Sequence, residues 1–91
     1  MAQVTFVDET TMGRRETGPR LEVAERRLTV RELIRRRIRR EEDRRLALRA
    51  FTANGLIVLV GDRQVTELDE EIDLTADTEV TFLRLIPLAG G

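Results

Sequence analysis

The stretch that decides the fold is EVTFLRLIPLAGG, residues 79–91. Val80 and Phe82 alternate with Thr81, which is the period of a β-strand. Pro87 has no N–H to donate and keeps the residue before it extended, so a strand ladder has to end ahead of it. The segment therefore predicts a last strand, followed by a short tail that finishes in two glycines.

Earlier parts of the chain supply partners for this strand. Residues 3–8 and 20–24 both alternate apolar and polar side chains, and together they predict a hairpin. Residues 10–19 hold glycine and proline among polar residues, so a turn or flexible loop is expected there. Residues 56–60, LIVLV, are wholly apolar and predict a central strand, from which a tight turn leads into a short strand at 63–65.

A helix is expected to begin after Thr29. Thr29 and Glu32 have the spacing of a capping box, in which the hydroxyl accepts from the third helical N–H and the glutamate reaches back. Four apolar residues then recur at the spacing of a buried helical face: Val30, Leu33, Ile34 and Ile38. The pattern predicts a helix with this face packed on the sheet.

This apolar pattern does not continue regularly. At 100° per residue, three charged side chains occupy the next positions of the stripe: Arg37, Glu41 and Arg45. Either one helix runs past the sheet into water, or the chain breaks and a second helix packs Leu46, Leu48 and Phe51. Because neither glycine nor proline interrupts residues 20–53, one long helix is favoured, with residues 54–55 (Asn-Gly) as its left-handed C-cap.

Together these elements predict an α+β fold, in which a mixed sheet of four to five strands is covered on one face by one main helix. The last strand is expected beside the first, in the middle of the sheet. Leu68, Ile72 and Leu74 are expected to anchor an acidic loop that precedes the last strand. Residues 1–86 then form one domain, and residues 87–91 form a flexible tail.

The element order, read together with the tail, resembles the β-grasp fold of ubiquitin and of the bacterial sulfur-carrier proteins of thiamin and molybdopterin synthesis. VGDRQV at 60–65 is similar to their strand-turn-strand, and IDLTADTEVTF at 72–82 to the loop that introduces their final strand. IPLAGG at 86–91 is similar to the carriers' proline-containing diglycine ending. Before residue 56 the resemblance is one of element order alone, and the long arginine-rich stretch departs from the compact carriers.

The resemblance implies that the chain end is a substrate for other enzymes. A ubiquitin-activating-type adenylating enzyme would use ATP to form an acyl-adenylate at Gly91. A ubiquitin-like protein modifier would then pass, as a thioester on a conjugating enzyme, to target amines. A sulfur carrier would instead hold a thiocarboxylate at Gly91 for a cofactor synthase. The third alternative is a β-grasp adaptor whose terminus is not conjugated.

The residues of the tail support this use independently of the resemblance. Gly90 and Gly91 have no Cβ, so the chain end can thread a narrow channel and leave its carbonyl open to a nucleophile. Three preceding residues are expected to contact the activating enzyme: Pro87, Leu88 and Ala89. Pro87 lowers the entropy lost on threading, and Leu88 supplies an apolar anchor.

The composition argues against several classes of function. With neither cysteine nor histidine, the 91-residue chain lacks a thiolate, the usual general base and the commonest metal ligands. An enzyme acting alone, a bound cofactor and a metal site are therefore not expected. No apolar run approaches the roughly 18 residues of a membrane span, and no signal peptide is recognised, so no membrane contact and a cytoplasmic location are expected. A genome whose base composition favours arginine codons is the preferred explanation for the absence of lysine. The functional alternative favours the modifier, because the domain offers its own terminus no side-chain amine, whereas Ile86-Pro87 favours the carrier.

All 16 basic residues are arginine, and they are placed unevenly. Residues 14–49 carry 14 arginines against 7 acids, which gives +7, whereas residues 50–91 carry 2 against 8, which gives −6. Four arginines mark a candidate docking surface for a protein partner: Arg35, Arg36, Arg39 and Arg40. Because acids flank this run and no tyrosine or tryptophan is present for stacking, a solvated helical face is favoured over nucleic-acid binding. The acids of residues 67–73 are expected to form a charged loop rather than a cation site.

Overall fold

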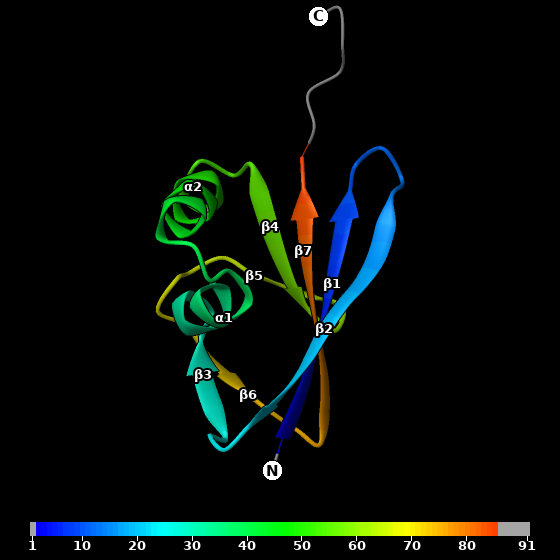
Figure 1. The fold of residues 1–91 in the computed structure, drawn as a ribbon, viewed down its shortest axis with the longest axis vertical. Coiled ribbons are helices and arrows are strands. Elements are labelled where there is room, and N and C mark those ends of the chain that lie inside the picture. Colours follow the sequence, from blue (N-terminus) through cyan, green and yellow to red (C-terminus); the bar gives the residue numbers. More distant parts are fainter. Residues whose placement is uncertain (1, 86–91) are drawn as a thin grey trace, which may run out of the picture.

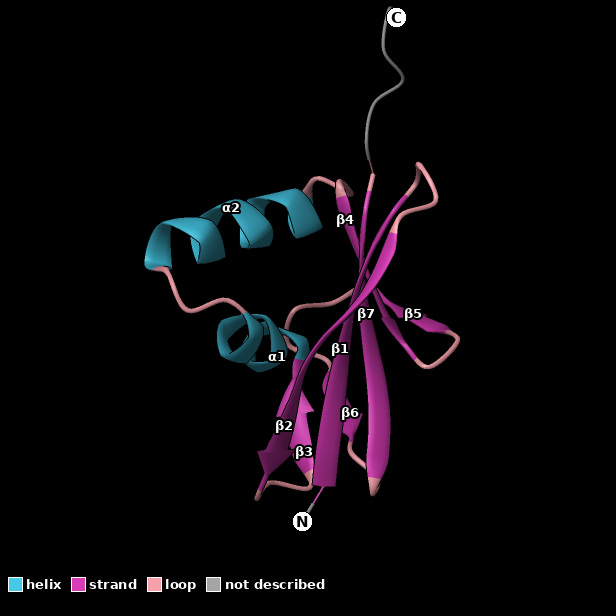
Figure 2. Cartoon of the chain, turned by 45° about the vertical axis from the view of Figure 1, so that its right-hand side comes forward, coloured by secondary structure: helices cyan, strands magenta, loops and turns pink. Residues whose placement is uncertain are grey.

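The structure is a computed structural model that describes residues 2–85. Nine elements follow one another in this range: β1 (Ala2–Thr10), β2 (Arg15–Val23), β3 (Arg27–Thr29), α1 (Val30–Arg37), α2 (Glu41–Thr52), β4 (Leu56–Val60), β5 (Arg63–Val65), β6 (Glu71–Asp73) and β7 (Asp77–Arg84). Five strands form one mixed sheet in the order β2-β1-β7-β4-β5, and β3 pairs with β6 in a second, two-stranded sheet. Both helices lie on the same side of the larger sheet (Figure 1 and Figure 2).

The last strand, β7, is the centre of the five-stranded sheet. It runs parallel to β1, with Val80 opposite Phe6, and antiparallel to β4, with Phe82 opposite Val58. The predicted α+β class and the pairing of the last strand with the first are therefore confirmed, and the arrangement is compatible with a β-grasp. Residues 56–60 form β4, which is an inner strand between β7 and the edge strand β5, so the prediction of a central strand there is confirmed as well.

The predicted hairpin of β1 and β2 is present, but its loop is shorter than expected. Residues 15–19, expected in the loop, belong to β2. The register shifts between Thr5 and Val7, where β2 contributes an extra residue and forms a β-bulge. Gly18 lies in this bulge, where an added Cβ would come within 3.2 Å of the backbone oxygen of Phe6. The glycine thus permits a close approach of the two strands.

Helix α1 begins where the sequence predicts. Thr29 is its N-cap, and the Thr29 hydroxyl accepts a hydrogen bond from the backbone N–H of Glu32 at 3.1 Å. The Glu32 carboxylate accepts a hydrogen bond from Arg35 at 3.2 Å. One half of the predicted capping box is therefore observed. The buried face of the helix consists of Val30, Leu33 and Ile34.

The favoured prediction of one long helix is wrong, because the chain breaks and forms two. Helix α1 ends at Arg37, and the backbone is extended at Ile38 and Arg40 before α2 begins. The break leaves the backbone groups of Ile38 paired. Its N–H donates to the carbonyl of Ile34, and its own carbonyl accepts a hydrogen bond from the side chain of Arg44.

The break places apolar rather than charged positions against the sheet. A straight helix would carry the charged stripe positions onto the core, and burying an unpaired charge costs several kcal/mol. Helix α2 instead buries Ala47 and Phe51, with Leu48 partly buried. Leu46, which the alternative with a second helix expected to pack, is 61% exposed. Asn54, with φ of 62°, follows α2 in the expected left-handed conformation.

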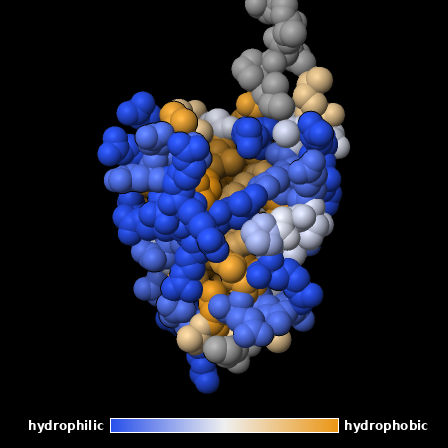
Figure 3. Space-filling view, viewed as in Figure 1, coloured by the Kyte–Doolittle hydropathy of each residue, from blue (hydrophilic) through white to orange (hydrophobic). Residues whose placement is uncertain are grey.

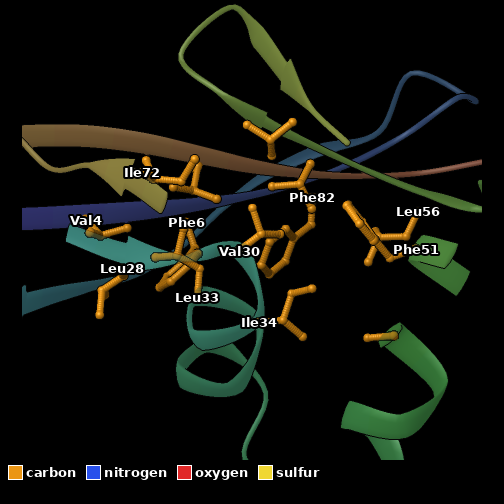
Figure 4. Packing of buried hydrophobic residues seen from close by; sticks show 14 of the residues in the cluster. Val4, Phe6, Leu28, Val30, Leu33, Ile34, Phe51, Leu56, Ile72 and Phe82 are labelled. Carbon is orange, nitrogen blue, oxygen red and sulfur yellow. The ribbon is translucent and has the colours of Figure 1, made fainter. Parts of the chain in front are cut away.

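The core lies between the sheet and the two helices, where side chains from both layers meet (Figure 4). The rings of Phe6 and Phe82 lie with their centroids 5.7 Å apart at 40°. Val30 and Ile34 from α1 are fully buried among them. Ile72, expected to anchor the acidic loop, is buried as well and belongs to β6, a strand that was not predicted. No helix within residues 2–85 is both long enough and apolar enough to cross a membrane.

Candidate functional site

The end of β7 is the point from which the predicted tail begins. Hydrogen bonds from both sides hold it in place. The N–H of Thr11 donates to the carbonyl of Arg84 at 3.1 Å, and the N–H of Leu85 donates to the carbonyl of Gly55 at 3.0 Å. The central strand is therefore tied to the β1–β2 turn and to the start of β4, up to the last described residue.

Five predicted site residues lie outside the described residues: Pro87, Leu88, Ala89, Gly90 and Gly91. Their roles in activation and transfer stay predictions. The strand that precedes them, β7, ends at the same end of the molecule as the β1–β2 turn (Figure 1).

Three of the four arginines predicted as a docking surface line one groove, which runs between α2 and the β1–β2 hairpin. Arg36 belongs to α1, and Arg39 and Arg40 lie in the segment between the helices. Arg35 also belongs to α1 but is not part of this lining, and it pairs with Glu32 at 3.2 Å. The structure thus brings together three of these side chains and sets the fourth apart.

The groove is large and has an apolar bottom. Its volume is about 1140 Å³. Figure 3 shows hydrophobic side chains in the hollow, between hydrophilic rims. The apolar part of its lining includes Leu21, Ile38, Leu46, Ala50, Leu56 and Phe82. The hollow exists because α2 packs beside β4 and leaves the sheet beneath the β1–β2 side less covered (Figure 2).

One ion pair crosses the groove from α1 to β1. A terminal nitrogen of Arg37 lies 2.6 Å from Asp8 Oδ2, and the two side chains are 27% and 38% exposed. The Nε of Arg37 is buried and has no hydrogen-bond partner among residues 2–85. A Cβ on Gly18 would lie 3.6 Å from the same guanidinium. This pair explains why a charged residue occupies the apolar stripe of α1, since Arg37 reaches a carboxylate on the sheet.

The charges at the rim are only partly paired. Six arginines and four carboxylates belong to the lining. Four of these arginines form ion pairs: Arg14, Arg36, Arg37 and Arg40. Arg39 and Arg84 form none within the part of the chain that the structure describes. The rim therefore presents two cations that are free to meet carboxylates from elsewhere.

Two groups near these elements have shifted pKa values. The guanidinium of Arg36 donates to both carboxylate oxygens of Glu25 and holds the pKa of that carboxyl below its ordinary value. Hydrogen bonds to Glu9 at 2.9 Å and to Glu79 at 3.2 Å raise the pKa of Arg15. Both shifts favour the charged form of exposed ion pairs. They stabilise contacts between elements and do not mark a general acid or base.

Arginines from other elements offset part of the negative charge at residues 67–73. Arg27 pairs with Asp73 at 2.7 Å and with Glu71 at 3.6 Å, Arg31 pairs with Asp69 at 3.4 Å, and Arg63 pairs with Glu70 at 2.7 Å. Among residues 2–85, no group of three histidine, cysteine, aspartate or glutamate side chains is placed to hold a metal ion. The sequence predicts a charged loop here, whereas residues 71–73 form β6, which pairs with β3.

Comparisons with protein-family models, curated proteins and solved structures return no match for this chain. The class that the structure itself shows is an α+β domain with a mixed five-stranded sheet and two helices across one face.

Sequence reasoning missed the groove and the pair that crosses it. Asp8 and Arg37 are 29 positions apart, so no local pattern links them. One signal was present, because Arg37 falls on the apolar stripe of the predicted helix. A charge on a buried face requires a partner of opposite charge. Asp8, at the end of the first predicted strand, is a carboxylate that could have been proposed as this partner.

Proposed function

We propose that the chain is a ubiquitin-like protein modifier whose Gly91 carboxylate is adenylated by an ATP-dependent activating enzyme and transferred to target amines. The observation that carries the proposal is the course of β7, the central strand, which leads directly into IPLAGG at 86–91. A compact α+β domain compatible with a β-grasp lies ahead of that segment. In this proposal the chain is a substrate, and the catalytic groups belong to its partner enzymes.

The proposed reaction consists of successive acyl transfers. A carboxylate oxygen of Gly91 attacks the α-phosphorus of ATP, which forms an acyl-adenylate and releases pyrophosphate. A thiolate of a partner enzyme then attacks the acyl carbon, forms a thioester and releases AMP. Finally a deprotonated target amine displaces the thiolate and forms an amide. Glycine at the last two positions supports each step, because no side chain shields the acyl carbon.

The absence of lysine supports transfer to another protein. Arginine is the only basic residue type in the chain, and a guanidinium remains protonated at neutral pH. The N-terminal amine is therefore the one acceptor amine that this sequence offers to its own activated end. A modifier without lysine is less readily joined to further copies of itself.

A sulfur carrier is the second candidate function, and the Ile86-Pro87 sequence favours it. Here a sulfide-level nucleophile attacks the same acyl-adenylate, releases AMP and leaves a thiocarboxylate at Gly91 for a cofactor synthase. Both candidates consume ATP, which fits a cytoplasmic location. They share the activation step, so one experiment addresses both.

The test combines intact mass with pyrophosphate exchange. The protein purified from its source is weighed first, because the proposal requires a chain end at Gly91. It is then incubated with ATP and the adenylating enzyme encoded nearest to it. We expect exchange with the wild-type chain, and none after deletion of Gly90 and Gly91 or in Gly91→Asp. Thr66→Asp is the matched control, since it adds the same carboxylate at an exposed position outside the helices and strands and should preserve exchange.

The outcomes separate the candidates. Covalent ladders on other proteins identify a modifier, and replacement of one oxygen by sulfur in the intact mass identifies a carrier. Equal exchange in the wild type and in the deletion variant, or no exchange with either, contradicts both and leaves the adaptor. Thermal unfolding of Gly91→Asp should match that of the wild type, which excludes misfolding as the cause of lost exchange.

A further inference from the structure

The groove between α2 and the β1–β2 hairpin is an open surface feature. Its volume of about 1140 Å³ is slightly above the roughly 300–1,000 Å³ range of small-molecule sites. Its apolar bottom is visible from outside between hydrophilic rims (Figure 3). These properties suit a segment of polypeptide better than a small ligand.

The apolar lining offers surface for a partner to cover. Leu46 lines the groove from α2 and is 61% exposed, although burial of a leucine side chain is favourable. Leu56 and Phe82 lie deeper, where 7% and 6% of each remain exposed. Leu21 and Ala50 are partly buried, on β2 and α2 respectively. An apolar side chain placed in the groove would therefore contact both of its walls.

The charge of the rim selects the chemistry of that partner. The lining holds six arginines against four carboxylates, and Arg39 and Arg84 have no ion pair within residues 2–85. Asp43 is an acid of the lining in the first turn of α2, where the helix dipole favours its charge. Asp43 also forms no ion pair among residues 2–85, so the unpaired charges of the lining are two arginines and one carboxylate. The net unpaired charge is positive, and it attracts carboxylates.

We infer that the groove binds an acidic amphipathic helix of a partner protein. Apolar side chains on one face of that helix pack against Leu46, Leu56 and Phe82, and carboxylates on its flanks pair with Arg39 and Arg84. This mode needs apolar anchors at the helical spacing i, i+3, i+4 and i+7. It is independent of the chemistry at Gly91.

Addition of an extended strand to the edge of β2 fits the structure less well. Pro19 in that strand has no N–H, and the bulge between the partners of Thr5 and Val7 interrupts the regular ladder. A helix requires no backbone hydrogen bonds from the groove, since its own are internal.

The test uses a synthetic helical peptide of about 14 residues with leucine at i, i+3, i+4 and i+7 and glutamate on its flanks. Two control peptides carry lysine for glutamate or serine for leucine. Titration into ¹⁵N-labelled protein should shift the amides of Leu46, Ala50 and Phe82 with the acidic peptide, and with neither control. Leu46→Ser should weaken binding about tenfold without unfolding the domain, because the side chain is exposed.

Charge reversal supplies the decisive comparison. Arg39→Glu with Arg84→Glu should weaken binding by about tenfold or more. Arg26→Glu with Arg49→Glu is the matched control, because these arginines also lack ion pairs among the described residues and lie outside the groove lining. This control changes the net charge equally and should alter the affinity less than about twofold.

Four results overturn the inference. They are the absence of saturable binding at millimolar peptide, equal binding of the lysine peptide, equal loss in the two charge-reversal pairs, and shifts confined to other surfaces. Concentration-dependent self-association that Leu46→Ser abolishes would assign the groove to a second copy instead. Shifts of the same amides on removal of residues 86–91 would assign it to the chain's own tail.

Discussion

Helices α1 and α2 lie on the same face of one sheet, yet only α1 is built fully into the core. Helix α1 starts at a side-chain cap from Thr29, and its buried face faces the central strands. The cap residue of α2, Arg40, makes no side-chain capping hydrogen bond, and Leu46 on that helix remains 61% exposed. Helix α1 therefore contributes its apolar face to the core, whereas α2 buries Ala47 and Phe51 but leaves Leu46 available for contact.

The largest expected effect is the loss of a buried side chain from α1. Ile34→Ala should lower the free energy of unfolding by about 3–4 kcal/mol, because the side chain is fully buried and its removal leaves a cavity. Leu46→Ala is the matched control on α2 and should change that free energy by less than about 0.5 kcal/mol. Urea unfolding monitored by circular dichroism measures both. Similar losses of unfolding free energy in the two variants would contradict the proposal that Ile34 on α1 is part of the core while Leu46 on α2 is not.

A smaller effect is expected from the ion pair that joins α1 to β1. Replacement of Asp8 by Asn and of Arg37 by Gln, singly and together, forms a double-mutant cycle. We expect a coupling energy of about 1.5 kcal/mol, because the pair is charged, hydrogen-bonded and partly shielded from water. Arg39→Gln with Asp8→Asn should show no coupling. A coupling near zero for Arg37 would mean that solvent screens this pair like a surface one.

The strands and the first helix could be predicted because local patterns determine them. Alternation at residues 3–8 and the apolar run at 56–60 each correspond to an observed strand. The pattern after Thr29 places the start of α1 at the observed residue. These signals depend on neighbouring positions, so a single sequence contains them.

The break between the helices and the groove could not be predicted in this way. Residues 38–40, Ile-Arg-Arg, have no helix-breaking side chain, so local propensity favours a continuous helix. The break depends on which side chains a straight helix would place against the sheet. That is a tertiary effect. The three-residue strands β3 and β6 are too short to show a period, and the bulge at Gly18 becomes evident only from the register of β1 and β2.

The two helix starts should differ in their response to capping mutations. Thr29→Ala should destabilise the domain by about 1 kcal/mol, since the N–H of Glu32 loses its acceptor. Arg40→Ser should instead stabilise it by about 0.5 kcal/mol, because α2 gains a cap that it lacks. Thermal unfolding resolves both signs. A loss of stability in Arg40→Ser would show that Arg40 supports α2 through another contact, such as its ion pair with Glu42.

The smallest effect concerns pH and the exposed pair of Arg36 with Glu25. Arg36 depresses the pKa of Glu25 in the folded state, so this contact stabilises the fold above the ordinary glutamate pKa. The contribution is lost as the pH falls through the lower, folded-state pKa. Arg36→Gln should therefore raise the pKa of Glu25 toward its ordinary value, and an NMR titration of the Glu25 carboxyl carbon measures the shift.

Arg39→Gln is the matched control for this titration, because Arg39 forms no ion pair within residues 2–85. It should leave the Glu25 curve unchanged. The two arginines lie three positions apart, but one ties α1 to the turn before β3 and the other faces the open groove. If both variants shift the curve equally, the general positive field of the helices holds the carboxyl ionised. The contact of Arg36 with Glu25 would then not be what distinguishes α1 from the segment that follows it.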